Sequence, residues 1–433
     1  MPILHSRSRK FKLPYFIGAV LICVGLFANE GVMKRLFSSD GFLEFETRIQ
    51  IWFFDAVLVL SGLFVLWYAR RTAGEGALRH SIRNYPKTTA SVFAFVLAAI
   101  FWFSTEVLFY FLNHFWTGDR VAYEHHIEEA FSRVATLGEG YQKDALVGYK
   151  PSPNMRKTSK MTFNGRPIYN VTYSTDELGR RITPIKTVGK PDKFILFFGC
   201  SYTFGDGVED DETLPFFVGQ LASRSRPYNY GVSGFGPQQM VAKLQQGNIK
   251  AEIDEPEGFL VYTFIDDHVH RVIGSQHIVQ TWGRYMPYYG LDSGGNLERR
   301  GDFEGGRPVS TLLFSLLRKS EIAQYFRVGV PQRINDDDFA LTAKIFLESR
   351  NAFSRLFKRE NFFVLIYPGS VWRKKLIPHL EKAGVQYFDY FNLFDPNQTD
   401  LHIERDRHPT PKAYRIVAER LTLDLRIQEA RKE

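Results

Sequence analysis

The sequence FILFFGCSYTFGDGVEDDETL, residues 194–214, places an apolar run directly before a turn that carries one serine. The run FILFFG is short and uncharged, which is typical of a strand buried on both faces of a sheet. Ser201 follows it between Gly199 and Gly205, and an acidic stretch comes next. Glycines allow a sharp turn and the close approach of another molecule. Serines are common in turns, so this motif alone fits a plain turn as well as a nucleophile.

The rest of the C-terminal half alternates between strand-like and helix-like segments. Three more short apolar runs suit buried strands, at residues 259–265, 362–369 and 385–391. Amphipathic helical stretches lie at residues 213–223, 238–250, 336–356, 371–383 and 411–427. Strands alternating with helices predict an α/β domain, a three-layer fold with a parallel sheet covered on both faces, over residues 191–433. Residues 276–306 are expected to form an inserted loop or hairpin. Residues 114–190 are expected to be a connector with a small β element, because residues 161–175 alternate between apolar and polar side chains.

The N-terminal region is expected to be an all-α membrane region, residues 1–113. Residues 13–28 and 88–105 carry no charge, and residues 49–69 carry only Asp55. A membrane helix needs about 20 mainly apolar residues, so the sequence predicts three transmembrane helices, the first of marginal length. The alternative is three buried core helices in a soluble domain.

The distribution of basic residues predicts the orientation of this region. Residues 1–12 contain four basic residues and no acidic one, and residues 70–87 contain five basic residues and one acidic one. The two segments contribute +4 each, which is the whole formal net charge of +8. Basic loops stay in the cytoplasm, so we expect a multi-pass protein with a cytoplasmic N-terminus and a periplasmic or extracellular domain from about residue 114. Because the excess charge reports topology, no nucleic-acid partner is expected.

The two cysteines do not suggest a structural disulfide. Cys23 lies in the first apolar segment and Cys200 adjoins the serine. We expect Cys200 to be a small buried side chain. No spacing of Cys and His typical of a metal site is present, so no metal ligands are assigned.

Three later motifs add polar groups at the expected strand ends. NYGVSGFGPQQ spans residues 229–239, and YTFIDDHVHR spans residues 262–271. DRHPTPKAY, residues 406–414, opens the last expected helix. A serine nucleophile needs a base and a carboxylate that orients the base, and His408 and Asp406 supply both types within one motif.

These four motifs, in this order, resemble the sequence blocks of the SGNH, or GDSL-type, hydrolases over residues 193–427. The resemblance implies a flavodoxin-like fold and serine-dependent ester hydrolysis without a metal or organic cofactor. It implies that Ser201 is the nucleophile, His408 the base and Asp406 the orienting acid. It also implies that the oxyanion is bound by the backbone N–H groups of Ser201 and Gly234.

Two positions depart from the family pattern. The third block usually supplies an Asn as a further oxyanion donor, and this chain has Asp266 there. An ionised carboxylate only accepts hydrogen bonds. Either Asp266 is protonated, or the backbone pair suffices, or His268 replaces it, and we favour the backbone pair. In the last block the acid usually lies three residues before the histidine, where this chain has Arg405, so Asp406 takes that role.

The resemblance predicts a membrane-anchored esterase that acts outside the cytoplasm. The expected substrates are glycans of the cell envelope or exopolysaccharide that carry O-acyl groups, with acetyl as the leading candidate, or another ester. Removal and transfer of the acyl group differ only in what attacks the acyl-enzyme, so both stay open. A transferase would need a membrane acyl-transfer or polysaccharide-export partner. The alternative from another class is a catalytically weak glycan-binding scaffold of an export assembly, which the Asp266 departure would suit.

Overall fold

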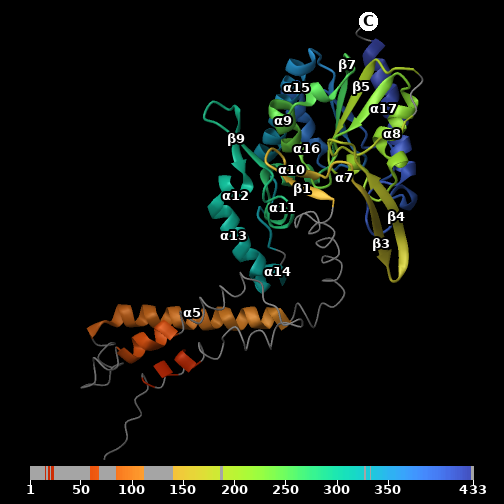
Figure 1. The fold of residues 1–433 in the computed structure, drawn as a ribbon. Coiled ribbons are helices and arrows are strands. Elements are labelled where there is room, and N and C mark those ends of the chain that lie inside the picture. The colour runs from red at the N-terminus through yellow and green to blue at the C-terminus, as the bar shows by residue number, and fades with distance from the viewer. Residues whose placement is uncertain are drawn as a thin grey trace, which may run out of the picture. The chain divides into compact units, whose positions relative to one another are not determined.

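The computed structural model describes residues 15, 18–19, 21–23, 59–67, 84–111, 140–185, 189–325, 328–331 and 333–430. The chain divides into two compact units, Met1–Thr105 and Glu106–Glu433. The described part of the segment expected to be a connector, residues 140–185, therefore belongs to the same unit as the C-terminal sheet (Figure 1).

The second unit is built on a sheet of five parallel strands. The strands are β5 (Lys193–Phe198), β6 (Ser225–Asn229), β7 (Glu257–Phe264), β10 (Phe362–Ile366) and β11 (Tyr387–Asp389). Their spatial order is β11-β10-β7-β5-β6, in which the first strand of the domain lies between the second and the third. This is the flavodoxin-like order. The predicted α/β class is confirmed, although the sequence analysis did not identify the residues of β6.

Helices cover both faces of the sheet (Figure 1). On one face lie α8 (Leu214–Leu221) and α17 (Pro411–Ala430), and on the other lie α9 (Pro237–Gln246), α15 (Asp336–Phe357) and α16 (Arg373–Lys382). Successive side chains of a strand point to opposite faces. Ile195 and Phe197 accordingly join the core around α8 and α17, and Leu196 and Phe198 join the core on the other face. All these side chains are buried, which explains why β5 has no polar face.

Two antiparallel hairpins precede the sheet. The first joins β1 (Tyr141–Asp144) to β2 (Gly148–Pro151), and the second joins β3 (Arg156–Phe163) to β4 (Arg166–Ser174). Asn164 and Gly165 both have positive φ, at 48° and 75°, as a tight hairpin turn requires. The second hairpin lies where the alternating pattern predicts strands.

A larger insertion lies between β7 and β10. It contains α10 (Asp267–Ile273), α11 (Gln276–Thr281), β8 (Pro287–Leu291), β9 (Leu297–Asp302), α12 (Phe303–Gly306), α13 (Pro308–Lys319) and α14 (Glu321–Tyr325). β8 and β9 form an antiparallel pair, so the hairpin expected within residues 276–306 is present. The shorter elements are α7 (Ser201–Phe204), η2 (Asp210–Glu212), η3 (Ile249–Glu252) and η4 (Thr399–Leu401).

The membrane helices predicted for the N-terminal region find less support than the C-terminal sheet. A helix, α5 (Pro86–Phe111), occupies the third expected membrane segment. Within the described ranges, however, no helix is both long and apolar enough to cross a membrane. The membrane helix expected at residues 88–105 is therefore not supported by the structure, and of the one expected at residues 49–69 only residues 59–67 are described. Most of the first expected membrane segment, residues 13–28, lies outside the described residues, as do the basic segment 1–12 and most of the basic segment 70–87.

Candidate active site

The predicted nucleophile lies at the carboxyl edge of the sheet. Ser201 is the first residue of α7, directly after β5, and is 2% exposed. β5 has β6 on one side and β7 on the other, so this edge is the switch point where open α/β sheets bind ligands. Gly199 has a φ of 150°, and a Cβ there would lie 2.3 Å from the Thr203 Oγ1. Only glycine therefore permits the turn that brings the chain from the buried strand to the serine.

The predicted base and its orienting acid are in direct contact. The Nδ1 of His408 contacts the Oδ1 of Asp406. Arg405 and Arg407 both adopt left-handed backbone conformations, with φ of 65° and 67°, so the loop is sharply folded around the pair. Burial lowers the pKa of His408, but the carboxylates of Asp406 and Asp206 outweigh it, and the net pKa is raised. A carboxylate on Nδ1 leaves Nε2 as the nitrogen that can take a proton.

The histidine loop packs against the serine turn. The ring centroids of Tyr202 and His408 are 5.4 Å apart, and the Tyr202 hydroxyl donates to the Arg407 carbonyl at 3.3 Å. Among the described residues, however, no hydrogen bond joins the Ser201 Oγ to the His408 ring. The structure thus brings the two loops together without closing the contact that proton transfer requires. Such contacts are often long in unliganded enzymes and shorten when substrate binds.

The predicted second oxyanion donor lies in the loop after β6. The Val232 N–H donates to the Gly199 carbonyl at 3.3 Å, so this loop runs beside the serine turn. Gly234 has a φ of 83°, and its carbonyl accepts from the Trp282 Nε1 at 3.0 Å. The Tyr149 hydroxyl donates to the Ser233 carbonyl at 2.7 Å. These two contacts fix the peptide groups around Gly234, which suits a preorganised backbone donor.

Asp266 makes contacts away from the serine turn. Its carboxylate accepts from the Ser370 hydroxyl and from the backbone N–H groups of Val371 at 2.9 Å and Trp372 at 3.2 Å. Burial raises the pKa of Asp266, these donors lower it, and the net pKa is raised. The side chain is thus an acceptor at the start of α16, and the structure gives it no contact of the kind expected for an oxyanion group.

His268 does not replace Asp266 either. Its ring is fully buried in the core beside Phe264, and its Nδ1 contacts the Tyr262 hydroxyl at 3.1 Å and the Ile265 N–H at 3.3 Å. Burial lowers the pKa of His268, so the neutral ring is favoured there. Of the three possibilities that the sequence left open, the backbone pair is the one that these contacts leave intact.

The carboxyl group of Asp206, which the sequence did not single out, contacts the loop after β6. Both oxygens of Asp206 accept from the Ser233 hydroxyl at 2.8 Å. Burial raises the pKa of Asp206, the nearby His408 lowers it, and the net pKa is raised. Asp206 follows the serine by one helical turn and a half, so its position in the same motif was a usable signal. Its pairing with Ser233 depends on the fold and could not be read from the motif.

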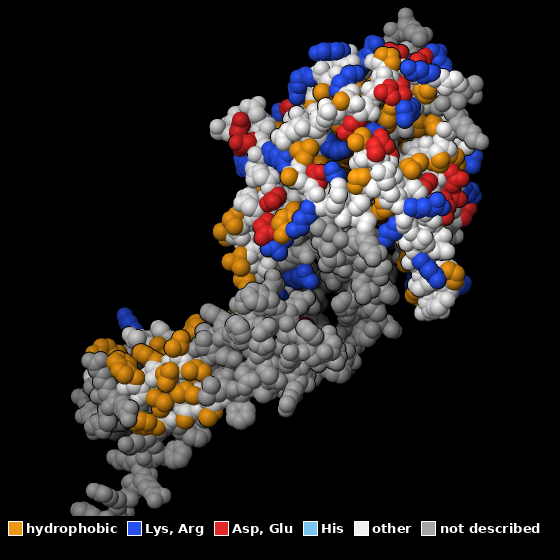
Figure 2. Space-filling model, in the orientation of Figure 1, with side chains coloured by type: hydrophobic (Ala, Val, Ile, Leu, Met, Phe, Trp, Pro, Cys, Tyr) orange, Lys and Arg blue, Asp and Glu red, His pale blue; other side chains and the backbone are white. Residues whose placement is uncertain are grey.

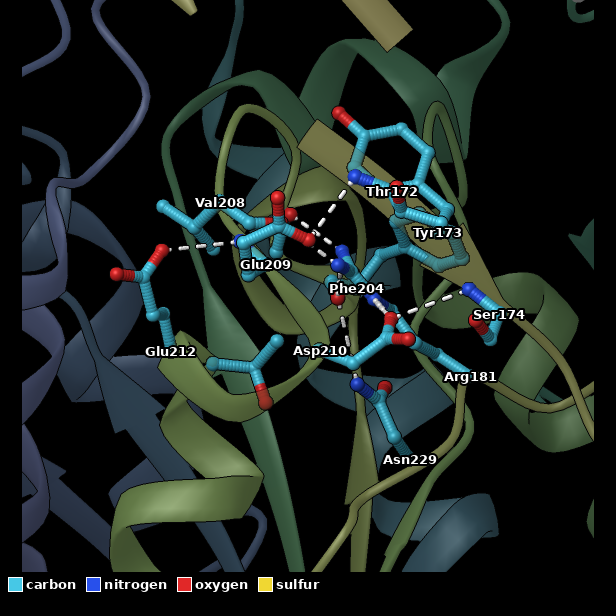
Figure 3. A network of polar contacts seen from close by, with 12 residues as sticks. Thr172, Tyr173, Ser174, Arg181, Phe204, Val208, Glu209, Asp210, Glu212 and Asn229 are labelled. Atoms are coloured by element: carbon cyan, nitrogen blue, oxygen red, sulfur yellow. Dashed lines mark hydrogen bonds and ion pairs between the residues drawn. The ribbon is translucent and has the colours of Figure 1, made fainter. Parts of the chain in front are cut away.

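Sequence analysis also missed a buried arginine that holds the segment after the serine (Figure 3). The Arg181 side chain is fully buried and donates to the carbonyls of Phe204 at 3.0 Å, Gly205 at 2.5 Å and Val208 at 2.7 Å. It also pairs with the Asp210 carboxylate at 3.0 Å. Arg181 lies in the segment interpreted as a connector, and nothing in its local sequence indicated burial.

The acidic stretch after the serine has a structural use (Figure 3). Glu209 accepts from the Thr172 N–H at 3.0 Å, and Asp210 accepts from the Ser174 N–H at 3.1 Å. Alternate N–H groups of a strand point to the same side, so these carboxylates occupy one free edge of β4. The acidic stretch after the serine is therefore bonded through its side chains to the backbone of the second hairpin.

Four aromatic side chains run from the end of α11 into β8, namely Trp282, Tyr285, Tyr288 and Tyr289, and such a group could form either a sugar-stacking platform or packing within the hairpin. Trp282 and Tyr289 are buried, and Tyr288 packs on Phe303 with ring centroids 5.4 Å apart. Tyr285 is exposed. Most of the group therefore belongs to the core that joins the insertion to β2, as packing predicts.

Comparisons with known proteins give distant likenesses. No protein-family model matches the chain, and no curated protein matches it. A solved structure of a lipolytic G-D-S-L family member from Veillonella parvula is 11% identical, and the match covers 52% of this chain and 94% of that one with a TM-score of 0.31. An acetylxylan esterase from Geobacillus stearothermophilus, solved as a catalytic mutant, is 12% identical over 55% and 96% of the chains, with a TM-score of 0.30. An acetyl xylan esterase from Butyrivibrio proteoclasticus is 11% identical over 57% and 66%, with a TM-score of 0.34. Likenesses at this level do not establish an activity, so the chemistry of the site has to follow from its own geometry.

Proposed function

We propose that the chain is an SGNH-type serine esterase. The Ser201 Oγ attacks the carbonyl carbon of an ester while the His408 Nε2 takes the hydroxyl proton. The tetrahedral intermediate collapses, the alcohol leaves with that proton, and an acyl-serine remains. Water attacks the acyl-serine with the same histidine as base, which releases the acid and restores the serine.

One observation carries this proposal most directly. The Asp406 carboxylate contacts the Nδ1 of His408, in a loop that packs against the turn holding Ser201. That turn lies at the switch point of a parallel sheet, where ligands of this fold class bind. A carboxylate in this position holds the imidazole in the tautomer with a free Nε2 and stabilises the imidazolium that forms.

The oxyanion is bound by backbone N–H groups of Ser201 and Gly234. The contacts of Asp266 with residues 370–372 support this, since they use its carboxylate as an acceptor. Loss of one donor from such a site typically costs about 10²–10³ in rate, so an esterase with two backbone donors remains active but slow.

The substrate class and the location rest on the sequence. The family resemblance favours O-acetyl groups on glycans of the cell envelope or exopolysaccharide. The three N-terminal apolar segments favour anchoring in a membrane, with the catalytic unit periplasmic or extracellular. Transfer of the acyl group to a second glycan, with a membrane partner as acyl donor, uses the same acyl-serine.

The test is turnover of aryl acetate and of acetylated polysaccharide by purified protein. We expect Ser201→Ala to lose hydrolysis of both substrates. Ser293→Ala, at an exposed turn position, is the matched control and should keep full activity. Equal turnover by Ser201→Ala and the unaltered chain would reject the proposal.

A second candidate is a glycan-binding scaffold without turnover. It is favoured by the missing hydrogen bond between Ser201 and His408 among the described residues, and by Asp266 at the usual Asn position. This candidate predicts that the unaltered chain binds acetylated polysaccharide without releasing acetate, and that Ser201→Ala binds it equally well. Acetate release by the unaltered chain excludes it.

A further inference from the structure

Asp206 is a carboxyl group that the proposed reaction does not use. On the face of the second unit that Figure 2 shows, acidic side chains lie at the surface among basic ones. Asp206 is only partly exposed, in the turn that follows α7, and it and His408 each shift the pKa of the other. A carboxylate withdrawn from water keeps its charge only with hydrogen-bond donors or cations nearby, so the contacts of Asp206 indicate what it does.

Asp206 bridges the serine turn and the loop after β6. Its backbone N–H donates to the Ser201 carbonyl at 3.1 Å, beside the N–H of Gly205 at 2.8 Å, which fixes its backbone relative to the nucleophile. Both of its carboxylate oxygens accept from the Ser233 hydroxyl at 2.8 Å. Asp206 thus links the residue that carries the nucleophile to the residue before Gly234.

The far end of this bridge is the peptide group that carries the proposed oxyanion donor. The Ser233 carbonyl and the Gly234 N–H belong to one planar peptide, in which they point in opposite directions. The Tyr149 hydroxyl donates to this carbonyl at 2.7 Å, and the Trp282 Nε1 donates to the next one, that of Gly234, at 3.0 Å. Those two contacts come from other segments, whereas the contact of Ser233 with Asp206 sets the peptide relative to the serine turn.

We propose that Asp206 is a positioning residue for the esterase reaction, which holds the Gly234 peptide in place relative to Ser201 through the Ser233 hydroxyl. The role rests on the backbone oxyanion donor of the proposed function. Misplacing a group of the site by about 1 Å can cost about 10²-fold in rate, so the bridge should matter more for the transition state than for substrate binding.

The charge of Asp206 also acts on His408. Burial lowers the pKa of His408, the carboxylates of Asp406 and Asp206 raise it, the Arg271 guanidinium lowers it, and the net pKa is raised. The Tyr202 ring packs on the same imidazole. Further ionisable groups that face Asp206 are Arg181, Tyr141, Tyr149, Tyr173 and Tyr414. Because the neutral imidazole is the base, loss of the Asp206 charge should move the acid limb of kcat/KM to lower pH.

The experiment separates the hydrogen bond from the charge with three substitutions in the full chain. Asp206→Asn keeps an oxygen that accepts from Ser233 and loses the charge. Ser233→Ala loses the hydrogen bond and keeps the charge, and Asp206→Ala loses both. Asp211→Asn is the matched control, because Asp211 is an exposed carboxylate of the same acidic stretch. The kcat and KM for aryl acetate are measured against pH for these four variants and for the double variant of Asp206→Ala and Ser233→Ala.

We expect kcat to follow the hydrogen bond and the acid limb to follow the charge. Ser233→Ala and Asp206→Ala should each lower kcat by about 10²-fold with little change in KM, and the double variant should lose no more than Asp206→Ala alone. Asp206→Asn should lose less kcat than Asp206→Ala, while both move the acid limb to lower pH and Asp211→Asn does not. Equal losses of kcat in Asp206→Asn and Asp206→Ala, or an unmoved limb in Asp206→Asn, would overturn the inference.

Hydrogen exchange tests the hold on the loop without turnover. The N–H groups of Val232 and Phe235 lie on either side of the donor and are bonded to the carbonyls of Gly199 and Val232. They should exchange faster in Ser233→Ala and Asp206→Ala than in Asp206→Asn or the unaltered chain. Unchanged exchange of the β5 amides in the same variants shows that each one is folded.

The two measurements distinguish this inference from the proposed function. A chain that releases acetate, and in which Ser233→Ala and Asp206→Ala change neither kcat nor exchange, keeps the esterase proposal and loses the role of Asp206. A chain that releases no acetate but exchanges as expected loses the esterase proposal and keeps the hold of Asp206 on the loop.

Discussion

A carboxylate on one nitrogen of an imidazole decides which nitrogen can accept a proton. Asp406 and His408 were predicted to form this pair, and the structure places them in contact. The prediction was possible because both residues belong to one short motif, so little depends on the rest of the fold. The left-handed conformations of Arg405 and Arg407, which shape the loop, were not predictable, since arginine rarely adopts them.

Asp406→Asn tests this pair through the pH dependence of kcat/KM. The neutral imidazole is the base, so activity is lost as the pH falls through the pKa of His408. In the unaltered chain that pKa is raised, and the acid limb should lie above the usual value of about 6.5. Removing the carboxylate removes part of the raising effect, so the limb should move to lower pH. The plateau rate should also fall. The same substitution in the serine-protease triad lowers kcat by about 10⁴-fold. A limb that stays in place would contradict the assigned role.

Gly234→Ala tests the backbone donor. A Cβ at Gly234 would lie 2.4 Å from the Tyr149 hydroxyl and 2.6 Å from the Trp282 Nε1, so the loop must shift. We expect kcat to fall by about 10²–10³, the usual cost of one lost oxyanion donor. Gly165→Ala is the control, because Gly165 also has a positive φ but would meet nothing within 4 Å. Equal effects of the two substitutions on kcat would show that backbone strain alone explains the loss.

At the scale of secondary structure, the segment after the serine is held by side chains from another part of the chain. Arg181 binds three of its carbonyls, and the Asn229 Nδ2 donates to the Thr203 carbonyl at 3.0 Å. Arg181 also forms a β-bridge with Asn229 at the edge of the sheet. The short helix α7 has only four residues, so its position depends on these contacts rather than on its own hydrogen bonds.

Arg181→Met should destabilise the fold. It removes the arginine as donor to three buried carbonyls and to the Asp210 carboxylate, and loss of one partner of a buried pair typically costs about 3–5 kcal/mol. The measurement is the free energy of unfolding in urea. Arg224→Met is the control, because the pair of Arg224 with Asp192 is exposed to solvent and its loss should change stability little. A loss at position 181 no larger than at 224 would contradict the role assigned to Arg181.

Asp266→Asn distinguishes a structural role at the start of α16 from a role in the oxyanion site. An amide oxygen replaces the carboxylate as acceptor for Ser370 and the two N–H groups, so the unfolding free energy should fall by about 1 kcal/mol. Turnover should change little, because the side chain does not contact the serine turn. A large rise in kcat would show instead that an amide at this position donates to the oxyanion.

The elements themselves were largely predictable, and their exceptions have physical reasons. Residues 194–198 of β5 and all of β10 show as uncharged apolar runs, and α15 shows as the amphipathic stretch predicted at residues 336–356, directly after its N-cap Asn335. β6 was not identified because its sequence, SRPYN, contains a serine, an arginine, an asparagine and a proline. The proline is tolerated because β6 is an edge strand, where the backbone nitrogen of a proline need not donate a hydrogen bond to a further strand.

At the scale of the whole molecule, strand order decides where the site lies. The order places the first strand of the sheet between its second and third, so the loops after β5 and β6 meet at one edge. The class of fold followed from the alternation of strands and helices, and the flavodoxin-like order from the family resemblance. The role of residues 140–185 could not be predicted from the sequence, because Tyr149 and Arg181 reach the site only through tertiary contacts.

The central claim, an activated serine at this edge of the sheet, is tested most directly by reaction of the full chain with a fluorophosphonate. Such a probe bonds to a serine whose proton a neighbouring base removes, and leaves an unactivated serine unmodified. Mass spectrometry of the digested protein should find the adduct on Ser201, and folded His408→Ala protein should show none. A folded, unaltered chain that stays unmodified at Ser201, or that is modified only at another serine, would contradict the claim.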